Sequence, residues 1–77
     1  MDNYRLLIVD DDANAVNALS VFLTEQGHQV EIVAGGGEAL AYCRRQLPDL
    51  VLLETTLPDM DGYEVCQRIR DMASTPV

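Results

Sequence analysis

The run from Leu50 to Leu53 is the feature that most constrains how this chain folds. Four apolar residues stand together there, between two prolines, Pro48 and Pro58. An apolar run this short, without polar alternation, is typical of a strand covered on both faces, as in a parallel sheet flanked by helices. Glu54 follows the run directly. A carboxylate at the carboxyl end of such a strand lies in the crevice where open α/β sheets hold their functional sites.

Two further segments have the character of strands. In residues 5–10 an apolar run from Leu6 to Val9 continues into the acidic triplet Asp10-Asp11-Asp12, whereas residues 30–34 alternate enough to form an edge strand. Between the strands, apolar residues recur with the spacing of one helical face. The pattern predicts strands over residues 5–10, 30–34 and 49–54 and helices over residues 13–26, 37–47 and 62–72. Because strands alternate with helices, we expect an α/β fold with right-handed crossovers and a parallel sheet.

Local signals mark the ends of these helices. Asp12 or one of its neighbours is expected to cap the first helix, Gly27 to end it in a left-handed conformation, and Asp61 to cap the third helix. The glycines from Gly35 to Gly37 precede the second helix. They lack the lysine of a phosphate-binding P-loop and the spacing of a dinucleotide fingerprint, so we interpret them as a flexible start of that helix.

Length and charge limit the classes of function. A chain of 77 residues forms one domain at most and buries only about 60–65% of the surface of its unfolded form. Stabilisation is therefore expected from a partner chain, a metal ion or a further part of the domain. The 13 acidic and 5 basic residues give a formal net charge of −8, which argues against nucleic acid and anionic membranes as direct partners. The sequence shows neither a membrane span nor a signal peptide, so we expect a cytoplasmic protein.

Carboxylates follow two of the predicted strands. If the strands over residues 5–10 and 49–54 are neighbours, their ends lie about 5 Å apart, which brings Asp10 and Asp11 close to Glu54. Clustered carboxylates repel each other unless they share a cation, and Mg²⁺ accepts a few carboxylates together with a carbonyl oxygen and waters. The alternative is that Asp11 and Asp12 only cap a helix and that Glu54 is an exposed strand end.

Six motifs, each weak alone, together resemble the receiver domain of two-component response regulators. Their order and spacing make the resemblance specific, and it covers the N-terminal three-fifths of such a domain. The motifs are Leu6–Asp12, Ala34–Leu40, Pro48–Leu53, Leu57–Glu64, Arg68–Arg70 and Thr75–Val77. The resemblance implies a flavodoxin-like fold, here a half-domain over residues 1–77 with three βα units and strand order 2-1-3, which stops before the fourth strand of the family order 2-1-3-4-5.

The resemblance also implies roles for single residues. In this family an aspartate at the end of the third strand accepts phosphate from a histidine kinase or a phosphotransfer protein, with Mg²⁺ bound. Asp10 and Asp11 match the acidic pair that holds the metal, and Thr56 matches the residue whose backbone carbonyl completes the site. Glu54 stands at the acceptor position. Asp59, Gly62 and Tyr63 match the supporting loop and helix start beside the site.

Glu54 departs from the family pattern. Glutamate is one methylene longer than aspartate, so its oxygen misses an in-line phosphoryl position by about 1 Å, and a displacement of that order costs about 100-fold in rate. We therefore expect that Glu54 is not phosphorylated and that the chain is not an enzyme. A permanent carboxylate can instead imitate the phosphorylated state, although its single charge is smaller than the charge of about −1.5 to −2 on a phosphoryl group.

The chain also lacks counterparts of two family residues, the hydroxyl residue after the fourth strand and the lysine after the fifth, and it contains no lysine at all. A sheet that stops at the third strand leaves Leu50, Val51, Leu52 and Leu53 on an open edge. The helix that would cover Ala18 and Val21 is missing as well. We expect a homodimer that pairs through this strand edge or through the first helix.

Two other functions fit parts of the pattern. The first is a phosphorylation-independent dimerisation or docking module that is derived from a receiver. The second is a phosphatase of the haloacid-dehalogenase type, which also begins with Asp-x-Asp after its first strand. Asp10 and Asp12 fit that motif, but Asn14 stands where a threonine or serine is required.

Overall fold

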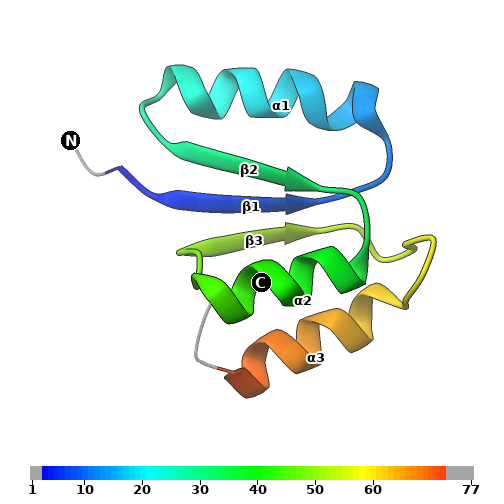
Figure 1. The fold of residues 1–77 in the computed structure, drawn as a ribbon. Helices are drawn as coiled ribbons and strands as arrows, with labels where there is room; N and C mark the ends of the chain where they lie inside the picture. Colours follow the sequence, from blue (N-terminus) through cyan, green and yellow to red (C-terminus); the bar gives the residue numbers. More distant parts are fainter. Residues whose placement is uncertain (1–2, 73–77) are drawn as a thin grey trace.

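The computed structural model describes residues 3–72, which fold as strands and helices that alternate along the chain (Figure 1). The strands form one parallel sheet in the order β2-β1-β3. The predicted α/β class, parallel sheet and 2-1-3 order are confirmed. The elements are β1 (Arg5–Val9), α1 (Ala13–Glu25), β2 (Gln29–Val33), α2 (Gly36–Arg45), β3 (Leu50–Leu53) and α3 (Gly62–Met72).

The bounds of α3 coincide with the predicted helix over residues 62–72, and the bounds of the other elements differ from prediction by one or two residues. β1 ends one residue before Asp10, and β3 ends one residue before Glu54. The amide of Asp10 still donates to the carbonyl of Val33 at 3.1 Å, and the amide of Glu54 donates to the carbonyl of Val9 at 2.9 Å. The sheet therefore holds these two residues at its edge although the strands have ended.

The predicted helix ends are confirmed by their hydrogen bonds and dihedral angles. Asp12 caps α1, because its Oδ1 accepts from the amides of Asn14 and Ala15 at 3.1 and 3.2 Å. Gly27 follows α1 with a φ of 93°, in the left-handed region that glycine adopts without strain. Asp61 precedes α3, and its Oδ1 accepts from the amide of Tyr63 at 2.8 Å.

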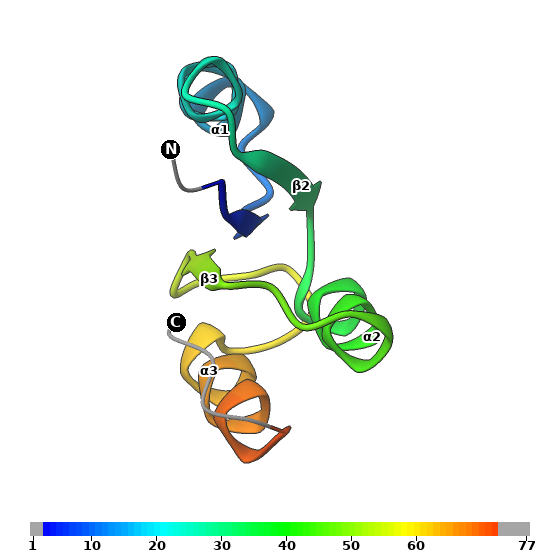
Figure 2. The ribbon, with the colours of Figure 1, turned by 90° about the vertical axis from the view of Figure 1, so that its left-hand side faces the viewer.

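The helices cover the two faces of the sheet unequally. Figure 2 shows α2 and α3 together on one face and α1 alone on the other. The main core lies between the sheet and the pair of helices α2 and α3. It consists of Leu7, Val9, Ala39, Leu40, Cys43, Val51, Leu57, Val65 and Ile69. On the opposite face, α1 contributes one buried residue, Val16.

Apolar side chains remain exposed on α1 and at the edge of the sheet. On α1, Leu19 is 40% exposed, Val21 50% and Phe22 57%. Within residues 3–72, β3 pairs with β1 only, so its other edge is open. Val51 is buried, whereas the other residues of β3 are half-buried.

Two further sequence observations concern the ends of the chain and the membrane. The motif Thr75–Val77, which the resemblance places at the start of a fourth strand, lies outside the described residues. None of the helices in residues 3–72 is long and apolar enough to cross a membrane.

Candidate functional site

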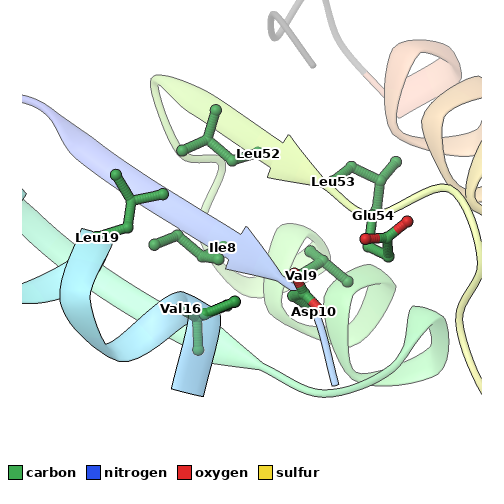
Figure 3. A pocket seen from close by; sticks show the side chains of 9 residues that line it. Ile8, Val9, Asp10, Val16, Leu19, Leu52, Leu53 and Glu54 are labelled. Atoms are coloured by element: carbon green, nitrogen blue, oxygen red, sulfur yellow. The ribbon is translucent and has the colours of Figure 1, made fainter. Parts of the chain in front are cut away.

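The parallel register of β1 and β3 places the predicted site residues at one end of the sheet. Val9 is paired with Leu53, so Asp10 and Glu54 each follow the last paired residue of neighbouring strands. Figure 3 shows both side chains at the same end of a groove between α1 and β3. The predicted meeting of these strand ends is therefore present in the fold.

The carboxylate of Glu54 is turned back onto the loop that follows it. Its Oε1 accepts from the amide of Thr55 at 2.8 Å, from the hydroxyl of Thr55 at 3.2 Å and from the amide of Thr56 at 3.4 Å. The loop is closed further along, where Thr56 and Asp61 form an isolated antiparallel bridge. One oxygen of Glu54 is thus held by its own loop in this conformation.

The acidic triplet after β1 is divided between two tasks. Asp10 is half-buried, and its Oδ1 accepts from the amide of Asp12 at 3.0 Å. Asp12 is exposed and caps α1. One of the two alternatives from the sequence held that Asp11 and Asp12 only cap a helix. It is confirmed for Asp12 and wrong for Asp11, because the cap of α1 is Asp12. Of the triplet, Asp10 lines the same groove as Glu54.

The predicted gathering of three carboxylates is not found in this conformation. Within residues 3–72, no group of three histidine, cysteine or acidic side chains is close enough to hold a metal ion. Oε1 of Glu54 is held by the amides of Thr55 and Thr56. The oxygen ligands that Mg²⁺ prefers are present at the neighbouring strand ends. As arranged here, however, they do not form a magnesium site.

Asp59 holds the loop after β3 onto the start of α2. Its Oδ1 accepts from the amide of Gly36 at 2.9 Å, and its Oδ2 accepts from the amide of Gly37 at 3.0 Å. The hydrogen bonds from Gly37 and Gly36 hold the pKa of Asp59 below its usual value, because they stabilise the charged carboxylate. The sequence suggested a supporting role for Asp59. It gave no sign of the contact with a helix 22 and 23 residues away.

The glycines beside this loop are required by close packing. A Cβ atom on Gly36 would lie 2.7 Å from Cγ2 of Val65 and 2.9 Å from the sulfur of Met60. A Cβ atom on Gly35 would lie 3.0 Å from Oδ1 of Asp59. The interpretation of these glycines as a flexible helix start was therefore incomplete, since two of them allow α2 to approach the loop and α3.

Gly62 brings α3 against the backbone of the loop between β3 and α3. Its amide donates to the carbonyl of Thr55 at 2.9 Å. A Cβ atom at this position would overlap the carbonyl oxygen of Glu54 and lie 2.8 Å from Cα of Thr55. The position of residue 54 thus depends on the absence of a side chain at the first residue of α3.

The match to known proteins extends over nearly the whole chain. Residues 6–77 match the sequence model of the response regulator receiver domain. The transcriptional regulatory protein AfsQ1 of Streptomyces coelicolor is 44% identical over 72 residues, which are 94% of this chain and 32% of that protein. The DNA-binding response regulator MtrA of Mycobacterium tuberculosis is 38% identical over 73 residues, which are 95% of this chain and 32% of that protein. The chain spans about a third of the length of these curated relatives.

Solved structures give the same result. A CheY-like response regulator receiver domain protein from Methanospirillum hungatei is 35% identical, with a TM-score of 0.88, over 92% of this chain and 57% of that chain. A response regulator from Chloroflexus aurantiacus, described as putative, is 39% identical, with a TM-score of 0.85, over 90% of this chain and 57% of that chain. Sequence and fold therefore agree on one family.

Proposed function

Because this chain belongs to the response regulator receiver family, we propose that it is a receiver module of a phosphorelay in which residue 54 does not accept phosphate. Receiver domains of response regulators are signalling modules that interact with histidine kinases. We infer the same class of partner here, a histidine kinase or a phosphotransfer protein, and a cytoplasmic location. The module acts by contact with other proteins rather than by turnover.

The observation that carries this proposal is the conformation of Glu54. Its Oε1 already accepts hydrogen bonds from the amides of Thr55 and Thr56. Oε1 would have to leave these donors in order to attack, and both oxygens start about one bond length further from the strand end than those of an aspartate would. Near-attack geometry is sensitive to displacements of about 1 Å, which cost about 100-fold in rate. We therefore expect phosphoryl transfer to Glu54 to be negligible.

A carboxylate that accepts hydrogen bonds from its own loop is suited to imitate a modified acceptor. A phosphoryl group on an aspartate would present oxygen acceptors and negative charge to the same loop amides. Glu54 supplies a single charge and two oxygens at that place permanently. We propose that the module is constitutively in a weakly activated state and that its contacts with partners do not depend on phosphorylation.

Magnesium binding is proposed as a weakened form of the family property. Asp10, Asp11, Glu54 and the backbone carbonyl of Thr56 are the groups that would hold Mg²⁺. The ion would neutralise the negative charge that collects at the strand ends. Since the amides of Thr55 and Thr56 already engage Oε1 of Glu54, we expect weak binding.

The test uses the substitution Glu54→Asp with acetyl phosphate and Mg²⁺, followed by intact mass measurement. We expect no phosphate adduct on the natural chain and an adduct on E54D. A matched control, Glu38→Asp, makes the same shortening at an exposed position in the first turn of α2 and should give no adduct. A phosphate adduct on the natural chain at Glu54 would refute the proposal.

A second candidate is a docking module that works without phosphorylation. The observation that favours it is the apolar groove between α1 and β3, together with the open edge of β3. The mass measurement separates the two candidates. If E54D also fails to take up phosphate and Mg²⁺ does not stabilise it, the receiver chemistry is lost and the docking module is the better description.

A further inference from the structure

The single histidine of the chain lies at the corner where α1 turns into β2. His28 follows Gly27 and directly precedes β2, and the residue is half-buried. Its Nδ1 accepts a hydrogen bond from the backbone amide of Tyr4 at 3.1 Å, so the contact joins residues 24 positions apart. Figure 1 shows this corner at the end of the sheet where the strands begin, opposite to the strand ends that carry the candidate site.

Further contacts fix the same corner. The amide of Gln29 donates to the carbonyl of Tyr4 at 2.9 Å, and the amide of His28 donates to the carbonyl of Leu23 at 3.3 Å. The ring centroids of Tyr4 and His28 lie 5.5 Å apart. His28 therefore connects the end of α1, through its backbone, with the segment that enters β1, through its ring. We call the contact of Tyr4 with the ring of His28 the Tyr4–His28 clasp.

The residue before Tyr4 also lies against this turn. A Cβ atom on Gly27 would lie 2.9 Å from Oδ1 of Asn3. Gly27 has a φ of 93°, so the turn is tight and brings the start of β2 back beside the start of β1. The clasp is thus the side-chain part of a corner that holds residues 3 and 4 in place.

The direction of the hydrogen bond fixes the protonation state of the ring. A backbone amide is a donor, so Nδ1 of His28 must offer a lone pair, and the proton of the neutral ring is then on Nε2. A protonated imidazole carries hydrogen on both nitrogens and cannot accept from Tyr4. Histidine ordinarily takes up this proton at about pH 6.5. The clasp is therefore available to the neutral ring only.

Protonation of His28 gains no ion pair in return. Over residues 3–72, the ion pair that the structure contains joins Arg68 to Glu64, and no carboxylate lies within 4.0 Å of the imidazole. The ionisable groups on the segments around the ring are those of Tyr4, Arg5, Glu25, Glu31 and Asp49. The net charge of −8 attracts a proton to the ring from a distance, but salt screens this attraction.

We propose that the Tyr4–His28 clasp is a pH-sensitive device, which holds the entry of β1 against the turn between α1 and β2 when the ring is neutral and releases it when the ring is protonated. Stability rises with pH wherever the unfolded chain binds more protons than the folded chain. The clasp excludes a proton that the unfolded chain takes up, so its stabilisation is present above about pH 6.5 and is lost below. The proposal is independent of phosphoryl transfer and of the chemistry at residue 54.

The single histidine makes a direct test possible. ¹⁵N NMR between about pH 5 and 8, in about 150 mM NaCl, follows the ring nitrogens of His28 and the amide of Tyr4 in one titration. We expect the Nε2–H form of the ring at the upper end of this range, and one midpoint for the ring and for the Tyr4 amide. The protection factor of the Tyr4 amide against solvent exchange should fall by about threefold to tenfold in acid, as expected for the loss of one hydrogen bond. The amide of Gly62, which donates to the carbonyl of Thr55, should keep its protection within about twofold, because the release is local.

Two matched substitutions separate the ring from other titrating groups. His28→Asn keeps an acceptor atom at the position of Nδ1 but does not titrate, so the protection of the Tyr4 amide should no longer depend on pH. His28→Gln moves the amide group to the position of Nε2, and protection should be low throughout. An Nδ1–H ring at high pH overturns the proposal, as does a Tyr4 amide that is equally protected on both sides of the ring titration. An unchanged pH dependence in H28N, or an equal loss of protection at Gly62, overturns it as well.

Discussion

The contact between Gly62 and the loop after β3 predicts that a single added methyl group lowers the stability of the fold strongly. In Gly62→Ala the added Cβ would lie 2.8 Å from Cα of Thr55 and 2.9 Å from its carbonyl oxygen, and it would overlap the carbonyl oxygen of Glu54. Carbon atoms in contact are normally about 3.5–4.0 Å apart. The start of α3 and the loop must therefore separate by about 0.7 Å or more, and each of the three contacts is with rigid backbone.

The expected loss follows from this overlap. Overfilling a packed site costs about 1–3 kcal/mol. The better helix propensity of alanine recovers little, because Gly62 is the first residue of α3. For 77 residues, an unfolding entropy of about 2.1 cal/mol/K per residue amounts to roughly 160 cal/mol/K, so 1 kcal/mol corresponds to about 6 °C. We expect the Tm of G62A to fall by about 6–18 °C.

Gly37→Ala is the matched control. It makes the same chemical change in the first turn of α2, where the nearest atom to an added Cβ is Oδ2 of Asp59 at 3.3 Å. This atom belongs to an exposed side chain that can yield, and alanine is the better helix former by up to about 1 kcal/mol. Thermal unfolding followed by circular dichroism should therefore show an unchanged or raised Tm. If G62A is as stable as G37A, close approach is not the reason for glycine at position 62.

Three further predictions concern the core, the loop and the strand ends. Ile69→Ala should lower the free energy of unfolding by about 2–5 kcal/mol in urea titrations, because Ile69 is fully buried. The control Arg68→Ala should lower it by less than about 0.5 kcal/mol, because it removes only an exposed ion pair. Asp59→Asn should lower the Tm at pH 7. The pKa of Asp59 is lowered in the folded state, so its charged carboxylate stabilises the fold fully above about pH 4. This stabilisation is lost as the pH falls further. The Tm values of D59N and the natural chain should therefore converge in acid. Calorimetric titration should show tighter Mg²⁺ binding by E54D than by the natural chain, and equal affinities would contradict the account of Glu54 and its loop.

Short-range patterns in the sequence were sufficient for the elements and their order. The apolar runs that end at Val9 and Leu53 each encode a strand, and Asp12 and Gly27 mark the ends of a helix by their own chemistry. The parallel order followed from the alternation of strands and helices. These features depend on neighbours within a few residues, and for that reason a single sequence reveals them.

The parts that could not be predicted depend on contacts across the fold. Asp59 bonds to amides more than 20 residues away, and nothing beside it in the sequence indicates which helix it caps. The side chain of Glu54 has two sets of partners within reach, the loop amides and the acids after β1. Likewise, only the fold shows that Leu19 faces the groove and that Val21 does not.

The unequal layers of the fold (Figure 2) meet at the end of the sheet where Asp10 and Glu54 lie. On one face of the sheet, Gly62 packs α3 against the backbone of the loop after β3, and the carboxylate of Asp59 binds the same loop to the amides at the start of α2. On the other face, the groove beside α1 ends at Asp10 and Glu54. Glu54 therefore belongs to both faces, because it lines the groove and its carboxylate is held by the amides of Thr55 and Thr56 in the loop that follows β3.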